Sequence, residues 1–201
     1  MKSIEMVNEV FNSEIKTIDH VRKSINNDYE LCIREILNCK GRIIVLGVGK
    51  SGLIGKKMAS TFASTGTPSF FIHSTEAVHG DLGMICEEDI VLAISNSGET
   101  SEVINTLPSI KEIGASLISI TKSKSSTLGK ASNIVIEIPI KAEADKYNLA
   151  PTNSSTATLV IGDAIALTVS QIKGFTKKDF GRYHPGGALG KSLTEEGFIN
   201  K

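Results

Sequence analysis

The sequence lacks three features that would place it in another class of protein. It has no run of about 18 or more apolar residues, so we expect no transmembrane helix. Its first residues, Met1 to Glu5, include no apolar segment of the kind found in secretory signal peptides, which favours a cytoplasmic location. The 22 lysine and arginine residues balance 22 aspartate and glutamate residues without any basic run, so neither nucleic acid nor a membrane is an expected partner.

Cysteine is also scarce. The three cysteines, Cys32, Cys39 and Cys86, form neither a Cys-x-x-Cys pair nor an even set for disulfides. We therefore interpret them as free thiols in a reducing compartment. A chain of 201 residues with 40% hydrophobic content can bury one core, which predicts a single domain overall.

Apolar spacing divides this domain at about residue 40. Residues 1–40 predict two amphipathic helices outside the main sheet, packing on the domain and on neighbouring subunits. Their apolar residues recur at helical spacing: Ile4, Val7, Phe11, Ile15 and Ile18, then Ile33, Ile36 and Leu37. Residues 41–201 instead alternate strand-like runs with helix-compatible segments. Strands are expected at 43–46, 69–73, 89–94, 117–121 and 134–140, and a final helix at about 156–173.

This alternation predicts an α/β fold with a parallel sheet covered by helices on both faces. Ligands of such sheets bind at the carboxyl ends of the strands, near a topological switch point. Residues 95–102 (SNSGETSE) follow a strand there and precede a helix, so their hydroxyl and backbone N–H groups can hold an anion such as phosphate. Taken alone, the same loop is also compatible with an ordinary turn and helix cap.

A second loop, residues 47–52 (GVGKSG), follows the first expected strand. The spacing of its glycines does not fit a P-loop, and the acidic residue of a dinucleotide-binding fold is absent about 20 residues later. We interpret it as a tight turn that carries one cation, Lys50, and one hydroxyl, Ser51, to the same sheet edge.

Several acid–base groups accompany these loops. His79 lies in a polar, glycine-rich loop, whereas His184 lies in residues 180–191, which contain so many glycines that we expect no regular structure there. Glu102 begins the helix after residues 95–101, and Glu143 follows the last strand. For each glutamate, a helix-terminal or solvated surface residue is the competing interpretation.

Together these groups favour an aldose–ketose isomerase that acts on a sugar phosphate. Hydroxyl-rich loops bind the phosphate, and a carboxylate or imidazole moves a proton between C1 and C2 through an enediol. Lys50 stabilises the developing enediolate charge, and no cofactor is required.

Five further segments, with residues 95–100, resemble the sugar isomerase (SIS) domain family, and within it the isomerases of arabinose 5-phosphate. The segments are 49–52 (GKSG), 61–68 (TFASTGTP), 77–84 (AVHGDLGM), 149–152 (LAPT) and 184–191 (HPGGALGK). The resemblance implies a flavodoxin-like three-layer αβα sandwich with five parallel strands, a homotetramer, and interconversion of ribulose 5-phosphate and arabinose 5-phosphate for Kdo and lipopolysaccharide synthesis.

The resemblance also implies two sets of site residues. The phosphate is held by Gly49, Ser51, Ser95, Asn96, Ser97 and Thr100. The sugar is surrounded by Lys50, His79, Glu102, Glu143 and His184, of which the last four would form an inhibitory zinc site if they converge. Of the two glutamates, Glu102 is our candidate for the enediol base, and the base is expected in the drier environment.

Typical members of this family continue into a pair of CBS domains, for which we expect no room after Lys201, so control by a nucleotide through such domains is not expected. Two other functions fit the same residues. One is a regulatory module that binds a sugar phosphate without converting it, and the other is an isomerase of a different sugar phosphate, such as a hexulose 6-phosphate.

Overall fold

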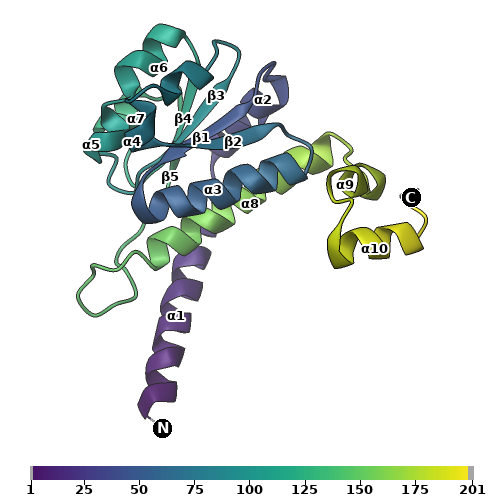
Figure 1. Cartoon of the computed structure of the whole chain (residues 1–201). Helices are drawn as coiled ribbons and strands as arrows, with labels where there is room; N and C mark the ends of the chain where they lie inside the picture. Colours follow the sequence, from purple (N-terminus) through teal and green to yellow (C-terminus); the bar gives the residue numbers. More distant parts are fainter. Residues whose placement is uncertain (1, 199–201) are drawn as a thin grey trace.

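A parallel sheet of five strands forms the centre of the computed structural model, which describes residues 2–198 (Figure 1). The strands are β1 (Ile43–Gly47), β2 (Ser69–His73), β3 (Ile90–Ile94), β4 (Ser116–Thr121) and β5 (Ile134–Glu137). They lie in the order β2-β1-β3-β4-β5, and each neighbouring pair is parallel. The expected five-stranded parallel sheet is therefore confirmed.

The central strands consist of continuous apolar runs because helices cover both faces of the sheet. Every residue of β1 and β3 is buried, as in a parallel sheet enclosed on both sides. The last strand is shorter than expected and ends at Glu137 instead of Ile140. Ile138 still donates its N–H to the Thr121 carbonyl (2.8 Å), but the next residue, Pro139, has no N–H to continue the ladder.

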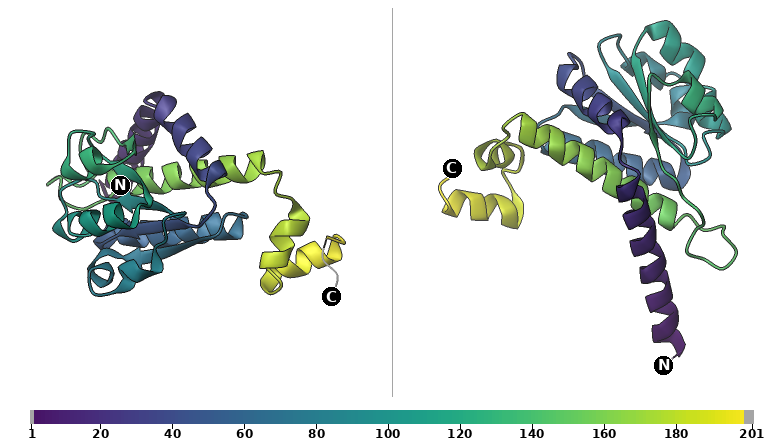
Figure 2. Two further views of the ribbon diagram at one scale, coloured as in Figure 1. Left: turned by 90° about the horizontal axis from the view of Figure 1, so that it is seen from above. Right: turned by 180° about the vertical axis from the view of Figure 1, so that it is seen from behind.

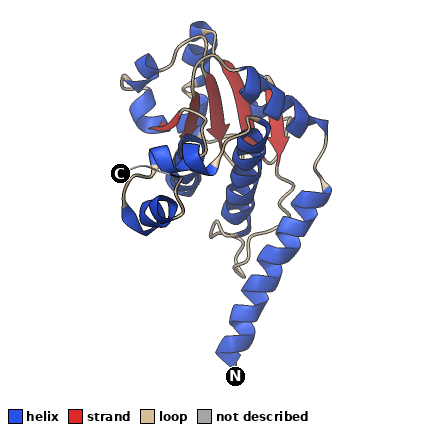
Figure 3. Ribbon diagram, turned by 90° about the vertical axis from the view of Figure 1, so that its right-hand side faces the viewer, coloured by secondary structure: helices blue, strands red, loops and turns tan. Residues whose placement is uncertain are grey.

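One face of the sheet is covered by α2 (Asn27–Asn38), α3 (Gly49–Ser64) and α8 (Asn153–Ile172). The other face is covered by shorter elements, namely α4 (Ser74–Ala77), η1 (Asp81–Met84), α5 (Ser101–Ile104), α6 (Leu107–Ile113) and α7 (Thr127–Ala131). Figure 3 shows the sheet between these two layers. The predicted three-layer arrangement is confirmed.

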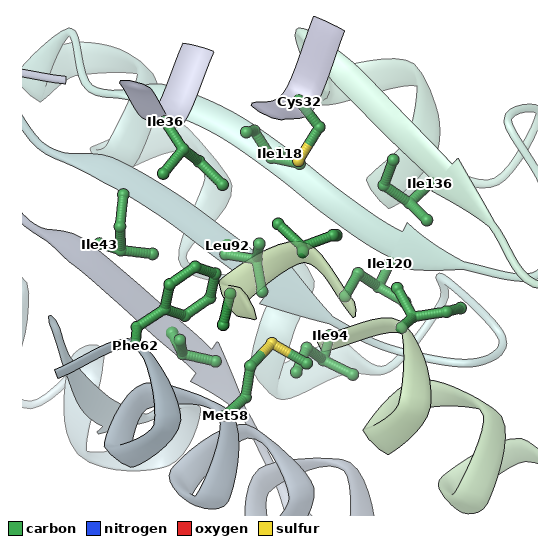
Figure 4. Close-up of a cluster of buried hydrophobic side chains, with 14 of the residues drawn as sticks. Cys32, Ile36, Ile43, Met58, Phe62, Leu92, Ile94, Ile118, Ile120 and Ile136 are labelled. Carbon is green, nitrogen blue, oxygen red and sulfur yellow. The ribbon is translucent and has the colours of Figure 1, made fainter. Parts of the chain in front are cut away.

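Of the two N-terminal helices, α2 packs directly on one face of the sheet. Its residues Cys32 and Ile36 are fully buried against the sheet, together with Met58 and Phe62 of α3 (Figure 4). By contrast, only the C-terminal half of α1 (Lys2–Lys23) contacts α8. The N-terminal half of α1 projects away from the body of the protein (Figure 3).

The longest core helix, α8, is apolar enough by length and composition to cross a membrane, although we expected no such segment from the sequence. Its apolar residues, including Ile161, Ile165 and Val169, are buried in the core that α3 and the sheet share. Here α8 is the central helix of a packed domain. It begins at Asn153, three residues before the expected start.

The expectation of an irregular segment at residues 180–191 is also wrong, because α9 (Lys177–Tyr183) and α10 (Gly187–Glu195) form a helical hairpin there. A capping box between Thr176 and Asp179 begins α9. Gly190 permits α10 to pack closely on the preceding chain, since a Cβ at this position would lie 2.5 Å from the His184 carbonyl oxygen. The hairpin extends beyond the C-terminal end of α8 (Figure 2).

Candidate active site

The order of the strands creates a crevice between the loops that follow β1 and β3. After β1 the chain passes into α3 on one face of the sheet, and after β3 it passes into α5 on the other face. Because β1 and β3 are neighbours, the loops diverge at a topological switch point. Both loops that were predicted to bind phosphate therefore lie where ligands of this class of sheet bind.

The loop after β3 is fixed from within by Ser95. Its hydroxyl lies 2.8 Å from Thr100 Oγ1 and accepts a hydrogen bond from the Gly98 N–H (3.1 Å). Gly98 has a φ of +70°, and a Cβ there would lie 2.2 Å from Ser126 Oγ, so this position requires glycine. Ser95 is only 2% exposed, and these contacts show that its hydroxyl fixes the loop, while its direct contact with a phosphate stays a prediction.

Ser97 and Asn96 follow Ser95 in this loop and differ in exposure. Ser97 is exposed, and its hydroxyl oxygen accepts a hydrogen bond from the Glu99 N–H (3.1 Å), which leaves the hydroxyl proton available to a ligand. Asn96 Oδ1 is buried with no hydrogen-bond partner among the residues described. Asn96 lines the cavities beside this loop, and the exposed Ser97 hydroxyl stays a predicted phosphate ligand.

The loop after β1 leads directly into α3, which begins at Gly49. Val48 precedes it in an extended conformation and supplies no side-chain cap within the described chain. The backbone N–H groups of the first turn are therefore available to an anion. Lys50 lies in a small hollow that Ser51 and Asn96 also line, so the cation lies beside both loops.

An adjoining cavity of about 280 Å³ extends from the crevice towards β4 and β5. Three residues of its wall, Ser51, Asn96 and Glu143, were candidates from the sequence, whereas Lys122, Asn148 and Ser154 were not. Lys122 directly follows β4, so its position at the end of a parallel strand was a signal present in the sequence. Asn148 and Ser154 depend on the path of the 138–152 segment, for which the sequence offers no such signal.

Glu143 is held by the N-terminus of α8. Its Oε2 accepts hydrogen bonds from the N–H groups of Thr152 (2.9 Å) and Ser154 (3.1 Å) and from the Thr152 hydroxyl (3.2 Å). Burial alone would raise the pKa of Glu143, but the hydrogen bonds from Ser154 and Thr152 outweigh it and lower the pKa. This carboxylate is therefore ionised and fixed in orientation.

Glu102 and His79 lie on the opposite side of the crevice. Glu102 belongs to α5 and His79 to the turn after α4, and these two helices pack against each other. Both side chains are exposed. The pKa of Glu102 is lowered by its own backbone N–H and by the Ser101 hydroxyl (2.9 Å), with a further contribution from His73. In this chain Glu143 is thus the drier glutamate, which corrects the expectation that Glu102 occupies the drier position.

His184 lies far from these residues. It ends α9, where its Nδ1 lies 2.9 Å from the Phe180 carbonyl oxygen and its ring stacks on Phe180 at 3.9 Å between ring centroids. The crevice is at the start of α8 and the hairpin is beyond its end, and a helix of 20 residues is about 30 Å long (Figure 1). One chain therefore does not bring His184 to the other candidates.

The four residues considered for zinc accordingly do not converge within one chain. Among residues 2–198, the structure contains no group of three or more His, Cys, Asp or Glu side chains arranged to hold a metal ion. A site made of His79, Glu102, Glu143 and His184 would need residues from more than one chain.

Comparisons with known proteins support the fold described above. The SIS domain model matches residues 36–168. Arabinose 5-phosphate isomerase KdsD from Pseudomonas aeruginosa is 49% identical over 180 residues (90% of this chain and 55% of the relative), and KdsD from Escherichia coli K12 is 48% identical over 185 residues (92% and 56%). The chain thus spans a little over half the length of these curated relatives.

A solved structure from E. coli CFT073, in complex with arabinose 5-phosphate, superposes with a TM-score of 0.90 at 50% identity. The match covers 92% of this chain and 98% of the solved one, so most of the fold described above has a counterpart there. The chain belongs to the SIS domain family.

Proposed function

We propose that this chain is an aldose–ketose isomerase that interconverts D-ribulose 5-phosphate and D-arabinose 5-phosphate. The observation that carries the proposal is the crevice at the switch point, where two loops present neutral donors and Lys50 beside a cavity lined by Glu143. The names of the KdsD relatives and the sugar phosphate bound in the solved structure support the same substrate. In a bacterium with this pathway, the product would enter Kdo and lipopolysaccharide synthesis.

In the proposed reaction, the phosphate binds to the first-turn N–H groups of α3, starting with Gly49, and to Ser51, Ser95, Asn96, Ser97 and Thr100. An acid or base among the site residues opens the cyclic sugar. A carboxylate then removes the C2 proton of the aldose, and the O1 oxygen gains a proton as the cis-enediol forms. Return of a proton to C1, with loss of the O2 proton, gives the ketose, so atoms and electrons balance without a cofactor.

Glu102 is the proposed base, and Glu143 is proposed to orient a substrate hydroxyl. Glu143 Oε2 is already occupied by three donors, which weakens it as a base. Glu102 makes one side-chain hydrogen bond, with Ser101, and belongs to the helix that follows the phosphate loop. Substrate and neighbouring residues would have to exclude water from Glu102, because the single chain leaves it exposed.

His184 is proposed to complete the site of a neighbouring chain in a homo-oligomer, which we expect to be a tetramer. The exposed apolar residues of α1 support such an assembly, since Ile4, Phe11 and Ile15 are each at least 60% exposed. Mixed oligomers of inactive His184→Ala and inactive Glu102→Gln chains should regain part of the activity. Pairs made with His79→Ala test the other histidine, and no recovery in any verified mixed oligomer would place the whole site within one chain.

A cytoplasmic location is also proposed, on the basis of the three free cysteines and the phosphorylated substrate. The function itself is tested by supplying purified protein with ribulose 5-phosphate and, separately, fructose 6-phosphate, and measuring the aldose formed. Turnover of ribulose 5-phosphate alone is the expected result. Turnover of fructose 6-phosphate alone would change the substrate, and binding without turnover of either sugar would favour a regulatory module.

A further inference from the structure

A second, larger cavity lies behind the substrate cavity, between α1, the segment after β5 and the start of α8. Its volume is about 430 Å³, which is within the range of small-molecule sites. The wall is lined by three lysines (Lys16, Lys23 and Lys141), by hydroxyl and amide side chains (Ser13, Thr17 and Asn153), and by His20, Asp19, Pro139 and Ala142.

The charge of this wall is strongly unequal. Its single carboxylate, Asp19, is already paired with Arg22 (2.8 Å) and Lys23 (2.5 Å). Lys16 and Lys141 have no carboxylate within ion-pair distance among the described residues. An anion that entered the cavity would therefore meet two ammonium groups that no carboxylate neutralises.

We propose that this cationic cavity is a binding site for a small phosphorylated metabolite with at least two negative charges, separate from the substrate site. Lys16 and Lys141 would contact the phosphate oxygens. Ser13 and Thr17 offer hydrogen bonds to the rest of the molecule. Asn153 is 2% exposed, and its Oδ1 has no hydrogen-bond donor within residues 2–198, so a ligand hydroxyl that reached it would satisfy a buried acceptor.

The cationic cavity and the substrate cavity share part of one wall. Lys141 and Ala142 line both cavities, and the next residue is Glu143. Asn153 connects the start of α8 to α1 and to the segment after β5, because its Nδ2 donates to Ser13 Oγ of α1 (2.9 Å) and to the Ala142 carbonyl (2.8 Å). A ligand in the cationic cavity therefore stabilises one conformation of the segment that carries Glu143, and its affinity is coupled to that of the substrate. This coupling rests on the proposed function, whereas the binding does not.

The test uses calorimetric titration of the full chain with inorganic pyrophosphate, with and without saturating arabinose 5-phosphate to fill the substrate site. With the sugar present we expect one pyrophosphate per chain, bound more weakly at higher ionic strength, whereas without the sugar the phosphate loops of the substrate site can bind a second. Lys16→Ala should weaken this binding about tenfold, the effect of losing one hydrogen bond to a charged group. Lys111→Ala, which removes an exposed lysine of α6, is the matched control and should change nothing.

No pyrophosphate binding in the presence of the sugar, or equal affinity in Lys16→Ala and the unmodified protein, would overturn the proposed site. If the protein failed to bind arabinose 5-phosphate, the titration without sugar would still report on the cationic cavity through Lys16, so the two proposals fail separately. The coupling requires that pyrophosphate and the sugar change each other's Kd by the same factor. A factor of one would refute the coupling.

Discussion

Removing the Glu143 carboxylate should destabilise the protein through the start of α8 as well as alter its activity. Thr152 is the residue before α8, and its own side chain does not cap the helix. Glu143, nine residues before Thr152, supplies the missing acceptor, because its carboxylate accepts hydrogen bonds from the N–H groups of Thr152 and Ser154. This carboxylate thus has the role that an N-cap side chain has in other helices.

The size of the effect follows from that role. Glu143→Ala leaves the two N–H groups to water and should lower the free energy of unfolding by about 1–2 kcal/mol, as removal of an N-cap does. For a protein of this length, this corresponds to a fall in Tm of roughly 2–8 °C. Glu143→Gln keeps an acceptor oxygen but loses the interaction of the charge with the helix dipole, which is worth about 0.3–1 kcal/mol.

The assay is urea unfolding followed by circular dichroism, with Glu112→Ala as the control. Glu112 is an exposed carboxylate of α6 for which the described structure shows no side-chain hydrogen bond, so its removal should cost less than about 0.5 kcal/mol. If Glu143→Ala and Glu112→Ala unfolded at the same urea concentration, the capping role would be refuted.

The same effect should depend on pH in a defined direction. Because folding lowers the pKa of Glu143, its contribution is complete above the unfolded-state pKa of about 4.3 and is lost as the pH falls through the lower folded-state pKa. The difference in stability between Glu143→Gln and the unmodified protein should therefore be constant from about pH 6 to 8 and shrink below about pH 4. An unchanged difference in acid would contradict this reasoning.

Three further predictions concern the reaction. Ser97→Ala should raise KM about two- to tenfold by removing one neutral phosphate contact, and an unchanged KM would show that Ser97 does not bind the phosphate. Glu102→Gln should abolish exchange of the substrate C2 proton with solvent while Glu143→Gln retains it, and the opposite pattern would exchange their roles. Activity should survive EDTA because Lys50 and fixed dipoles stabilise the enediolate, and loss on chelation that metal restores would contradict a metal-free reaction. Added Zn²⁺ should inhibit if an oligomer brings His79, Glu102, Glu143 and His184 together across chains.

The sheet was predictable from the sequence because its strands are buried on both sides. Runs such as Ile43 to Leu46 and Ile90 to Ile94 contain no polar residue. This pattern is typical of strands that are buried on both faces, as in a parallel sheet covered by helices. Helix α2 was harder to place. Its apolar stripe predicts a buried face, but the stripe does not specify whether Cys32 and Ile36 meet the sheet of the same chain or another subunit.

The site was predictable where a residue directly follows a strand, and less so elsewhere. Lys50, Ser51, Asn96 and Ser97 occupy the expected edge of the sheet because parallel strands bring their carboxyl ends together. The bond between Glu143 and the start of α8 depends on how residues 138–152 fold back, which no local pattern encodes.

The C-terminal hairpin shows a different limit. The number of glycines at residues 180–191 predicted a segment without regular structure, but individual glycines have separate roles. Gly181 is buried within α9, Gly186 precedes α10 in an extended conformation, and Gly190 allows the two parts of the hairpin to approach each other. Composition alone gave the wrong answer because glycine serves close packing as well as flexibility.

The position of the hairpin at the end of α8 makes the length of that helix a functional variable. Insertion or deletion of one residue at Ile172, which is exposed and follows the last buried residues of α8, would turn everything beyond it by about 100° around the helix axis and move it by about 1.5 Å. The body of the same chain would keep its core, yet His184 would point in another direction. If His184 serves a neighbouring site, such a change leaves each chain folded and disables its partner, so the number of residues in α8 is constrained by a requirement that no contact within the chain reveals.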